Sequence, residues 1–207
     1  DFGDLAGDLF GFDTAALIGL EFRYGLFPGT QLGISRGNTR TVQFFGRRSL
    51  RRKGDAGAIG LDAVVFIEGL DNFTEEYSPG VGVVISKQIE ERAAFYVEPM
   101  WVGNTNNPGR LHVPAGAVSN DDNTFMIGLG ARLRIRPTVY LVGEFIPRVA
   151  GFDLGDDHVT FGVEKRVGGH SFQVNFSNSL GSTLGQIAQG ASDDNWFIGF
   201  NITRKFY

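Results

Sequence analysis

Side chains alternate between apolar and polar along most of this chain, and the segment that ends at Phe206 shows the alternation best. One face of that segment carries Trp196, Ile198, Phe200, Ile202 and Phe206, and the other carries Gly199, Asn201, Thr203 and Lys205. Because a β-strand directs successive side chains to opposite faces, the segment separates an apolar environment from a wet one. When nearly every strand of a chain does this at bilayer-spanning length, the pattern indicates a barrel in lipid.

About eleven segments of this kind follow one another, and most are about 9–13 residues long, the length that a tilted strand needs to cross a bilayer. They cover residues 14–25, 30–36, 39–52, 57–69, 80–89, 92–103, 123–135, 138–147, 158–167, 169–178 and 195–206. We therefore predict an all-β fold, an antiparallel up-and-down transmembrane β-barrel that occupies residues 1–207 as one domain.

Composition argues against several other classes of protein. No run of about 18 apolar residues is present, so a transmembrane helix is not expected. The formal net charge of −4 argues against a nucleic-acid partner. The chain has no cysteine, which excludes a disulfide framework and a thiol nucleophile.

The predicted connections alternate between tight and long. Tight connections are expected at 53–55, near 90–91, at 136–137 and at 167–169, and long ones at 70–79, 104–122, 148–157 and 179–194. Only Gly37–Asn38 is tight where a long loop is expected. Bacterial barrels have short periplasmic turns and longer outside loops. We therefore expect an integral protein of the bacterial outer membrane, in contact with its lipid, with the C-terminus on the periplasmic side.

The predicted strand count is odd, whereas bacterial single-chain barrels have even numbers of strands. Traced backward from the C-terminus, the strand at 14–25 runs from outside to inside, so residues 1–13 would form an outside loop. A further strand would then precede Asp1. We expect the complete barrel to have about twelve strands, since an open edge would leave unpaired backbone groups in lipid.

Segments near both ends of the chain resemble a known family. They are GGHSFQVNFSNS at 168–179, FIGFNITR at 197–204, LFGFD at 9–13, LEFRYGL at 20–26 and LGISR at 32–36. These segments are similar to those of an uncharacterised outer-membrane β-barrel family, the domain of unknown function 5777. The resemblance implies a membrane barrel with a strand ahead of the position of Asp1, and it implies no substrate and no catalytic residue.

The C-terminal aromatic resembles the signal that the barrel-assembly machinery reads. Phe200, Ile202 and Phe206 lie in phase on the apolar face, whereas Tyr207 departs from that pattern by one residue. The resemblance implies that this machinery is a partner of the chain.

The polar faces of the predicted strands carry many charges. Counted in phase, the residues that should point into the lumen are Glu21, Arg23, Asp62, Glu68, Glu98, Arg132, Arg134, Arg136, Glu144, Arg148, Glu164 and Arg166. The arginines at 132, 134 and 136 form a basic ladder on one strand. We expect Glu98 and Glu144 on neighbouring strands to supply its counter-charges, because the planar Arg fork binds a carboxylate in two places.

Two functions fit such a lumen. Bulky inward residues such as Phe66, Tyr96 and Met100 favour a charge-paired, largely filled lumen, and hence a structural or docking component of an envelope complex. Alternatively, the ladder lines a narrow channel or binding barrel for a small solute. An outer-membrane hydrolase and a soluble β-sandwich are further alternatives, because alternation alone does not distinguish lipid from a protein core.

We expect no catalytic site, cofactor or metal ion. The three histidines are His112 in a long loop, and His158 and His170 at strand ends on opposite sides of the membrane, which gives no plausible catalytic triad. Acidic pairs such as Asp121 and Asp122 lie in predicted loops without the spacing of a calcium-binding EF-hand. The sequence therefore does not predict an enzyme.

Overall fold

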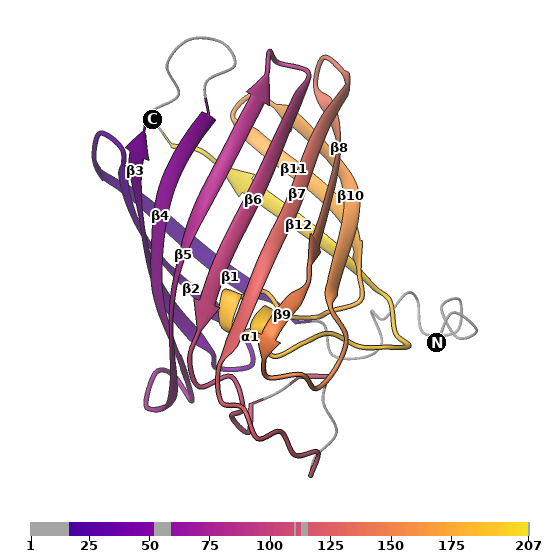
Figure 1. Cartoon of the computed structure of the whole chain (residues 1–207). Helices are drawn as coiled ribbons and strands as arrows, with labels where there is room; N and C mark the ends of the chain where they lie inside the picture. Colours follow the sequence, from indigo (N-terminus) through magenta and orange to yellow (C-terminus); the bar gives the residue numbers. More distant parts are fainter. Residues whose placement is uncertain (1–16, 52–58, 110, 113–115, 207) are drawn as a thin grey trace.

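The chain forms one antiparallel sheet that curves into a barrel (Figure 1). The computed structural model describes residues 17–51, 59–109, 111–112 and 116–206. The strands are β1 (Gly19–Phe27), β2 (Thr30–Gly37), β3 (Val42–Arg51), β4 (Ile59–Leu70), β5 (Glu75–Ile89), β6 (Ala93–Val102), β7 (Thr124–Arg136), β8 (Val139–Ile146), β9 (Arg148–Gly151), β10 (His158–Val167), β11 (His170–Ser177) and β12 (Phe197–Arg204). Each strand pairs with its neighbour in chain order, except that β9 pairs with β7 and β8 pairs directly with β10.

Strand phase separates the two faces of the sheet as the sequence predicts. On β4, the inward side chains of Val64, Phe66 and Glu68 are buried, whereas Val65 and Ile67 between them are exposed. The same alternation recurs on β5, β6, β10 and β11. The prediction of an all-β antiparallel barrel is confirmed.

Two ends of the barrel differ in their connections. The tight-turn end carries the connections 28–29, 90–92, 137–138 and 168–169, and it lies at the top of Figure 1. The loop end, at the bottom, carries 38–41, 71–74, 103–123, 152–157 and 178–196. The predicted turn at 53–55 and the predicted loop at 1–13 lie outside the described residues. A strand ahead of Asp1 stays a prediction.

One predicted long loop, 70–79, is wrong. Strand β5 begins at Glu75, so only residues 71–74 connect it to β4, and Asp71, Asn72 and Phe73 turn the chain with positive φ. Pro79 lies opposite Ile67 of β4, and on its other side its carbonyl accepts a hydrogen bond at 2.8 Å from the amide of Gly103, directly after β6. This turn is hydrogen-bonded to the other short one at the same end, through the amide of Asn72 and the carbonyl of Arg40, 2.7 Å apart.

Two further elements depart from the predicted pattern at the loop end. The predicted loop 148–157 begins with β9, which continues β8 beyond Pro147 and pairs with the start of β7. The predicted loop 179–194 contains a short helix, α1 (Leu184–Ala188). Within the described residues, no helix has the length and apolarity needed to cross a membrane.

Glycines on the inner face make room for large side chains of the neighbouring strand. A Cβ on Gly80 would collide with the ring of Phe66, and one on Gly82 would lie 3.0 Å from Cγ of Met100. The same relation joins Gly33 to Phe45, Gly128 to Glu98, and Gly199 to Asn175. At these five positions a large inward side chain lies across the inner face of the sheet, over a glycine of the neighbouring strand.

We predict that Gly80→Ala destabilises the barrel by about 1–3 kcal/mol, because the new methyl group displaces the Phe66 ring from its recess. Urea unfolding in lipid vesicles, followed by tryptophan fluorescence, measures the change. Gly130→Ala is the matched control, since its Cβ would meet Tyr96 at an ordinary 3.5 Å. Equal stability of the two variants would contradict the recess argument.

Candidate functional site

Helix α1 lies inside the loop end of the barrel (Figure 1). Its N-cap is Thr183, whose side chain accepts a hydrogen bond from the amide of Gln186. The Gln186 side chain in turn accepts from the amide of Ser182 at 3.0 Å. This Thr-x-x-Gln arrangement is a variant of the capping box, which explains why so short a segment forms a helical turn.

A cluster of apolar side chains packs between α1 and the barrel wall. Its buried members are Phe66, Met100, Val102, Met126, Ile146 and Ala188, with Phe45, Leu184 and Ile187 packed against them. They come from β3, β4, β6, β7 and β8 as well as from the helix. Val102 and Ala188 are completely buried. The loop end of the lumen is therefore closed by a dry layer.

Buried hydrogen bonds hold α1 to separate parts of the barrel. The Gln186 side chain donates to Thr41 at 3.3 Å, and the Thr124 hydroxyl donates to the carbonyl of Ala188 at 3.1 Å. The Gln189 side chain donates to Asn107 at 2.9 Å. Because these partners lie in three different segments, the helix closes the barrel and also connects its loops.

Glu68 is the one fully buried acid near this closure among the described residues, with 1% of its surface exposed. The Gln43 side chain donates to its carboxylate at 3.3 Å, and the Thr183 hydroxyl and the Gly185 amide at the start of α1 also interact with it. A Cβ on Gly185 would lie 2.6 Å from the carboxylate oxygen. Residue 185 therefore has to be glycine for the helix to seat on Glu68.

His112 ties the long loop 103–123 to the loop that carries α1. Its Nε2 accepts a hydrogen bond from the amide of Leu180 at 2.9 Å and lies 3.1 Å from the hydroxyl of Ser179. Burial lowers the pKa of His112 below the ordinary value. Within the described residues no carboxylate hydrogen-bonds to its Nδ1, so the Ser–His pair lacks the third member of a hydrolytic triad.

Charged residues fill the middle of the lumen nearer the tight-turn end. Glu164 lies 3.5 Å from Nε of Arg132 and 2.7 Å from Nε of Arg166. Both guanidinium groups also lie over the ring of Tyr140, Arg132 at 4.0 Å from its centroid. Two arginines therefore share one acid and one aromatic face at this level of the lumen.

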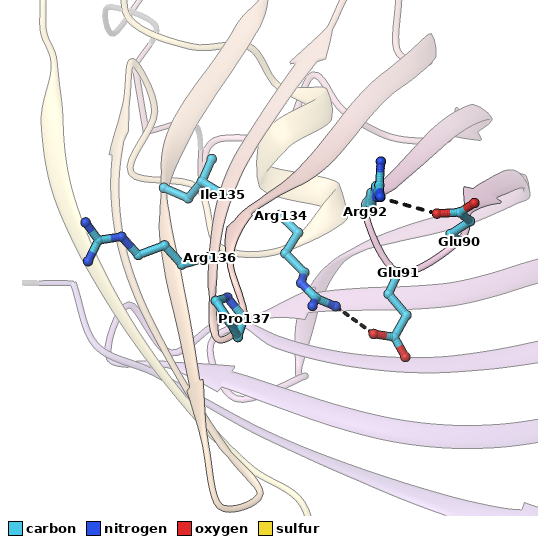
Figure 2. A pocket seen from close by; sticks show the side chains of 7 residues that line it. All are labelled: Glu90, Glu91, Arg92, Arg134, Ile135, Arg136 and Pro137. Atoms are coloured by element: carbon cyan, nitrogen blue, oxygen red, sulfur yellow. Dashed lines mark hydrogen bonds and ion pairs between the residues drawn. The ribbon is translucent and has the colours of Figure 1, made fainter.

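The arginine ladder does not act as one unit. Arg132 pairs with Glu164, whereas Arg134 reaches Glu91 in the β5–β6 turn at 2.6 Å. Figure 2 shows Arg136 extending away from Arg134, beyond the irregularity in strand pairing between them. Residues of the two turns line an open hollow of about 520 Å³, namely Glu90, Glu91, Arg92, Arg134, Ile135, Arg136 and Pro137.

The expected counter-charges of the ladder are wrong. Glu144 lies opposite Gly130 and Glu98 lies opposite Gly128, which are one and two inward positions nearer the loop end than Arg132. Arg47, which bonds to Asp62, is the cation that attracts Glu98. The register of β6 and β8 against β7 places the two acids opposite glycines instead of arginines. The sequence alone does not show this register, which is why the prediction failed.

The remaining predicted site residues lie in three places. Glu21 and Arg23 pair with each other on β1. Arg148 lies opposite the buried Met126 at the start of β7, and its guanidinium donates to the carbonyls of Leu154 and Gly155 and so folds the loop that follows β9. The residues of the expected assembly signal, Phe200, Ile202 and Phe206, are exposed.

Comparisons with known proteins agree with this architecture. The model of the DUF5777 family, described as a membrane-bound β-barrel domain, matches residues 1–206. A solved structure of the NanC porin is similar to this chain, with a TM-score of 0.61 and 12% identity over 92% of this chain and 93% of that one. At that identity the likeness shows the fold alone. No curated protein matches the chain.

We predict that acid loosens the loop closure through His112. Because the folded protein lowers the pKa of His112, the neutral ring is favoured in the closed state, and the unfolded loop binds more protons. The stabilisation by His112 is therefore complete above about pH 6.5 and declines as the pH falls below it. Hydrogen-exchange protection of the Leu180 amide, corrected for intrinsic rates, measures the effect.

The His112→Gln variant should remove this pH dependence, because glutamine does not titrate. The His170→Gln variant should retain it, because His170 lies at the tight-turn end. A protection profile that depends on pH equally in wild type and His112→Gln would contradict the assignment.

Proposed function

The chain belongs to the DUF5777 family of membrane-bound β-barrel domains, and from this premise we propose that it is a closed barrel of the outer membrane. In this proposal it is a structural or docking component of an envelope complex, with a charge-paired and largely filled lumen. The observation that carries the proposal is the position of α1 against the barrel wall, which we call its seat. There an apolar layer packs against the helix, and buried hydrogen bonds connect the helix and its C-cap to Thr41, Asn107 and Thr124.

The closure is unfavourable for passive conduction. A hydrated solute passing the loop end would have to separate Ala188 from Met126 and Val102, all of which are almost fully buried. It would also leave the side chains of Gln186 and Gln189 without partners, and an unsatisfied buried polar group costs about 1–3 kcal/mol. A filled lumen leaves the two ends of the barrel as working surfaces.

The ends differ in a way that supports docking at the tight turns. The hollow there is lined by both acids and arginines. Arg134 pairs with Glu91 and so links β7 to the β5–β6 turn, and Arg92 lies 3.5 Å from Glu90 in the same turn. We place this end in the periplasm, because long loops in bacterial barrels face outward. A periplasmic protein surface with charges of both signs is the partner class that fits.

A narrow channel is the second candidate. The paired guanidinium groups of Arg132 and Arg166, and the open hollow near Arg134, would offer cationic contacts to a small anionic solute that enters from the tight-turn end. The related fold is that of a protein named as a porin. Conduction would require α1 to leave its seat.

An enzymatic role is not proposed. The nearest approach to catalytic geometry is His112 with Ser179, and the Nε2 of that ring already accepts the amide of Leu180. It therefore has no free lone pair with which to activate the serine.

Single-channel recording in planar bilayers tests the closed state. We predict that the intact protein is silent, and that Gly185→Val conducts, because the larger side chain collides with Glu68 and expels α1. Gly25→Val is the matched control, since nothing lies within 4 Å of a Cβ at that position, and it should stay silent. Co-purification of a stable partner after mild detergent extraction would support docking.

The channel candidate predicts the opposite result. Intact protein would then conduct, and Arg132→Ala and Arg134→Ala would reduce its preference for anions. That outcome would overturn the docking proposal.

A further inference from the structure

The lipid-facing wall of the barrel carries exposed basic side chains near the tight-turn end. Four of them stand in regular strand phase on the outward face, namely Arg48 on β3, Lys87 on β5, Lys165 on β10 and Arg204 on β12. We call them the basic collar. Each continues an apolar row: Phe161 and Val163, for example, precede Lys165 on the outward face of β10.

Every member of the basic collar lies beside an aromatic ring. The guanidinium of Arg48 lies over Phe27 at 5.2 Å from the ring centroid, and that of Arg204 over Phe206 at 5.1 Å. Across the strand pairing, Lys87 is opposite Phe95, and Lys165 is opposite Phe172. Aromatic rings of membrane barrels collect at the level of the lipid headgroups, so these neighbours place the basic collar at that depth.

The charge of the wall is of one sign at this end. Among the described strands, the outward positions in the half next to the tight turns include no aspartate or glutamate. Glu90 and Glu91 lie in a turn beyond the strands and bond to Arg92 and Arg134. The loop end carries Arg36 and Arg40 together with a larger number of exposed acids, at Glu75, Glu76, Asp121, Asp122, Asp153, Asp156, Asp193 and Asp194.

Physical chemistry gives these side chains one suitable partner. Long Lys and Arg stems lie along apolar surface and direct their charges to the membrane surface. There an anionic headgroup attracts each cation, and the attraction falls off within a Debye length. Because β3, β5, β10 and β12 lie at different places around the barrel, the contacts form a ring rather than one pocket (Figure 1).

We propose that the basic collar binds the phosphate groups of anionic glycerophospholipids around the tight-turn end of the barrel. The choice of glycerophospholipid over the phosphates of lipid A rests on the orientation given above, in which this end lies in the periplasmic leaflet. The basic collar would therefore help to set the depth of the tight-turn end in the membrane.

Native mass spectrometry of the full chain in neutral detergent tests this proposal with added phosphatidylglycerol, phosphatidylcholine or lipid A. We expect the intact protein to bind phosphatidylglycerol in preference to phosphatidylcholine. We expect Lys87→Gln/Lys165→Gln to lose at least about threefold in apparent affinity for phosphatidylglycerol, since each contact is electrostatic and additive. Heat-modified gel migration checks that the variant is folded, and the single variant Lys165→Gln serves if the double variant is not.

The matched control is Arg36→Gln/Arg40→Gln, which removes two positive charges at the loop end. It should leave phosphatidylglycerol binding unchanged. The proposal is overturned by equal binding of the two phospholipids, by an equal loss in the control, or by a collar dependence for lipid A that exceeds the one for phosphatidylglycerol. This assay measures lipid binding and not conductance, so failure of the lipid-binding proposal is distinguishable from failure of the docking proposal.

Discussion

The hydrogen bonds between neighbouring strands are the constraint on which the rest of the structure depends. In hydrocarbon a backbone amide has no water to bond, so each strand must pair along its length, as β4 does from Ile59 to Leu70. Pairing fixes the pleat, and the pleat sends every second side chain into the lumen. Lipid therefore selects the outward set, including Val65 and Ile67, whereas the inward set is free to take up other tasks.

In this chain several inward side chains pack against one another and against α1. Bulky groups such as Phe66 and Met100 fit into a limited bore because the neighbouring strand offers Gly80 and Gly82. The apolar layer that results lies at the loop end, where it supplies a seat for α1. A helix of one turn has little stability of its own, so its order derives from this seat and from Glu68 below Gly185.

The parts that sequence could predict are those set by a period of two. Phase alone identifies the strands, including the arginine-rich β3, and the inward side of Glu68 and Glu164. Register between strands could not be predicted in this way. Arg132 on β7 pairs with Glu164 on β10 across the intervening β8, and the pattern of residues along a single strand does not show which residues of other strands lie opposite. Helix α1 could not be predicted from the sequence for another reason. Its only local signal is the capping pair Thr183 and Gln186, and the helix is otherwise stabilised by apolar contacts with five strands that are distant in the sequence.

The charges of this barrel differ between the lumen, the loop end and the lipid-facing wall. Acids inside the lumen, such as Asp62 and Glu164, pair with arginines, where the restricted access of water makes each contact stronger. Exposed acids are most numerous at the loop end, and cations such as Lys165 lie on the lipid-facing wall at the other end, where Glu90 and Glu91 lie in a turn beyond the strands. A net charge of −4 thus conceals a dipolar barrel. The cations of the wall and the long loops therefore lie at opposite ends of the barrel, so its two ends offer different surfaces to the membrane and to the solvent.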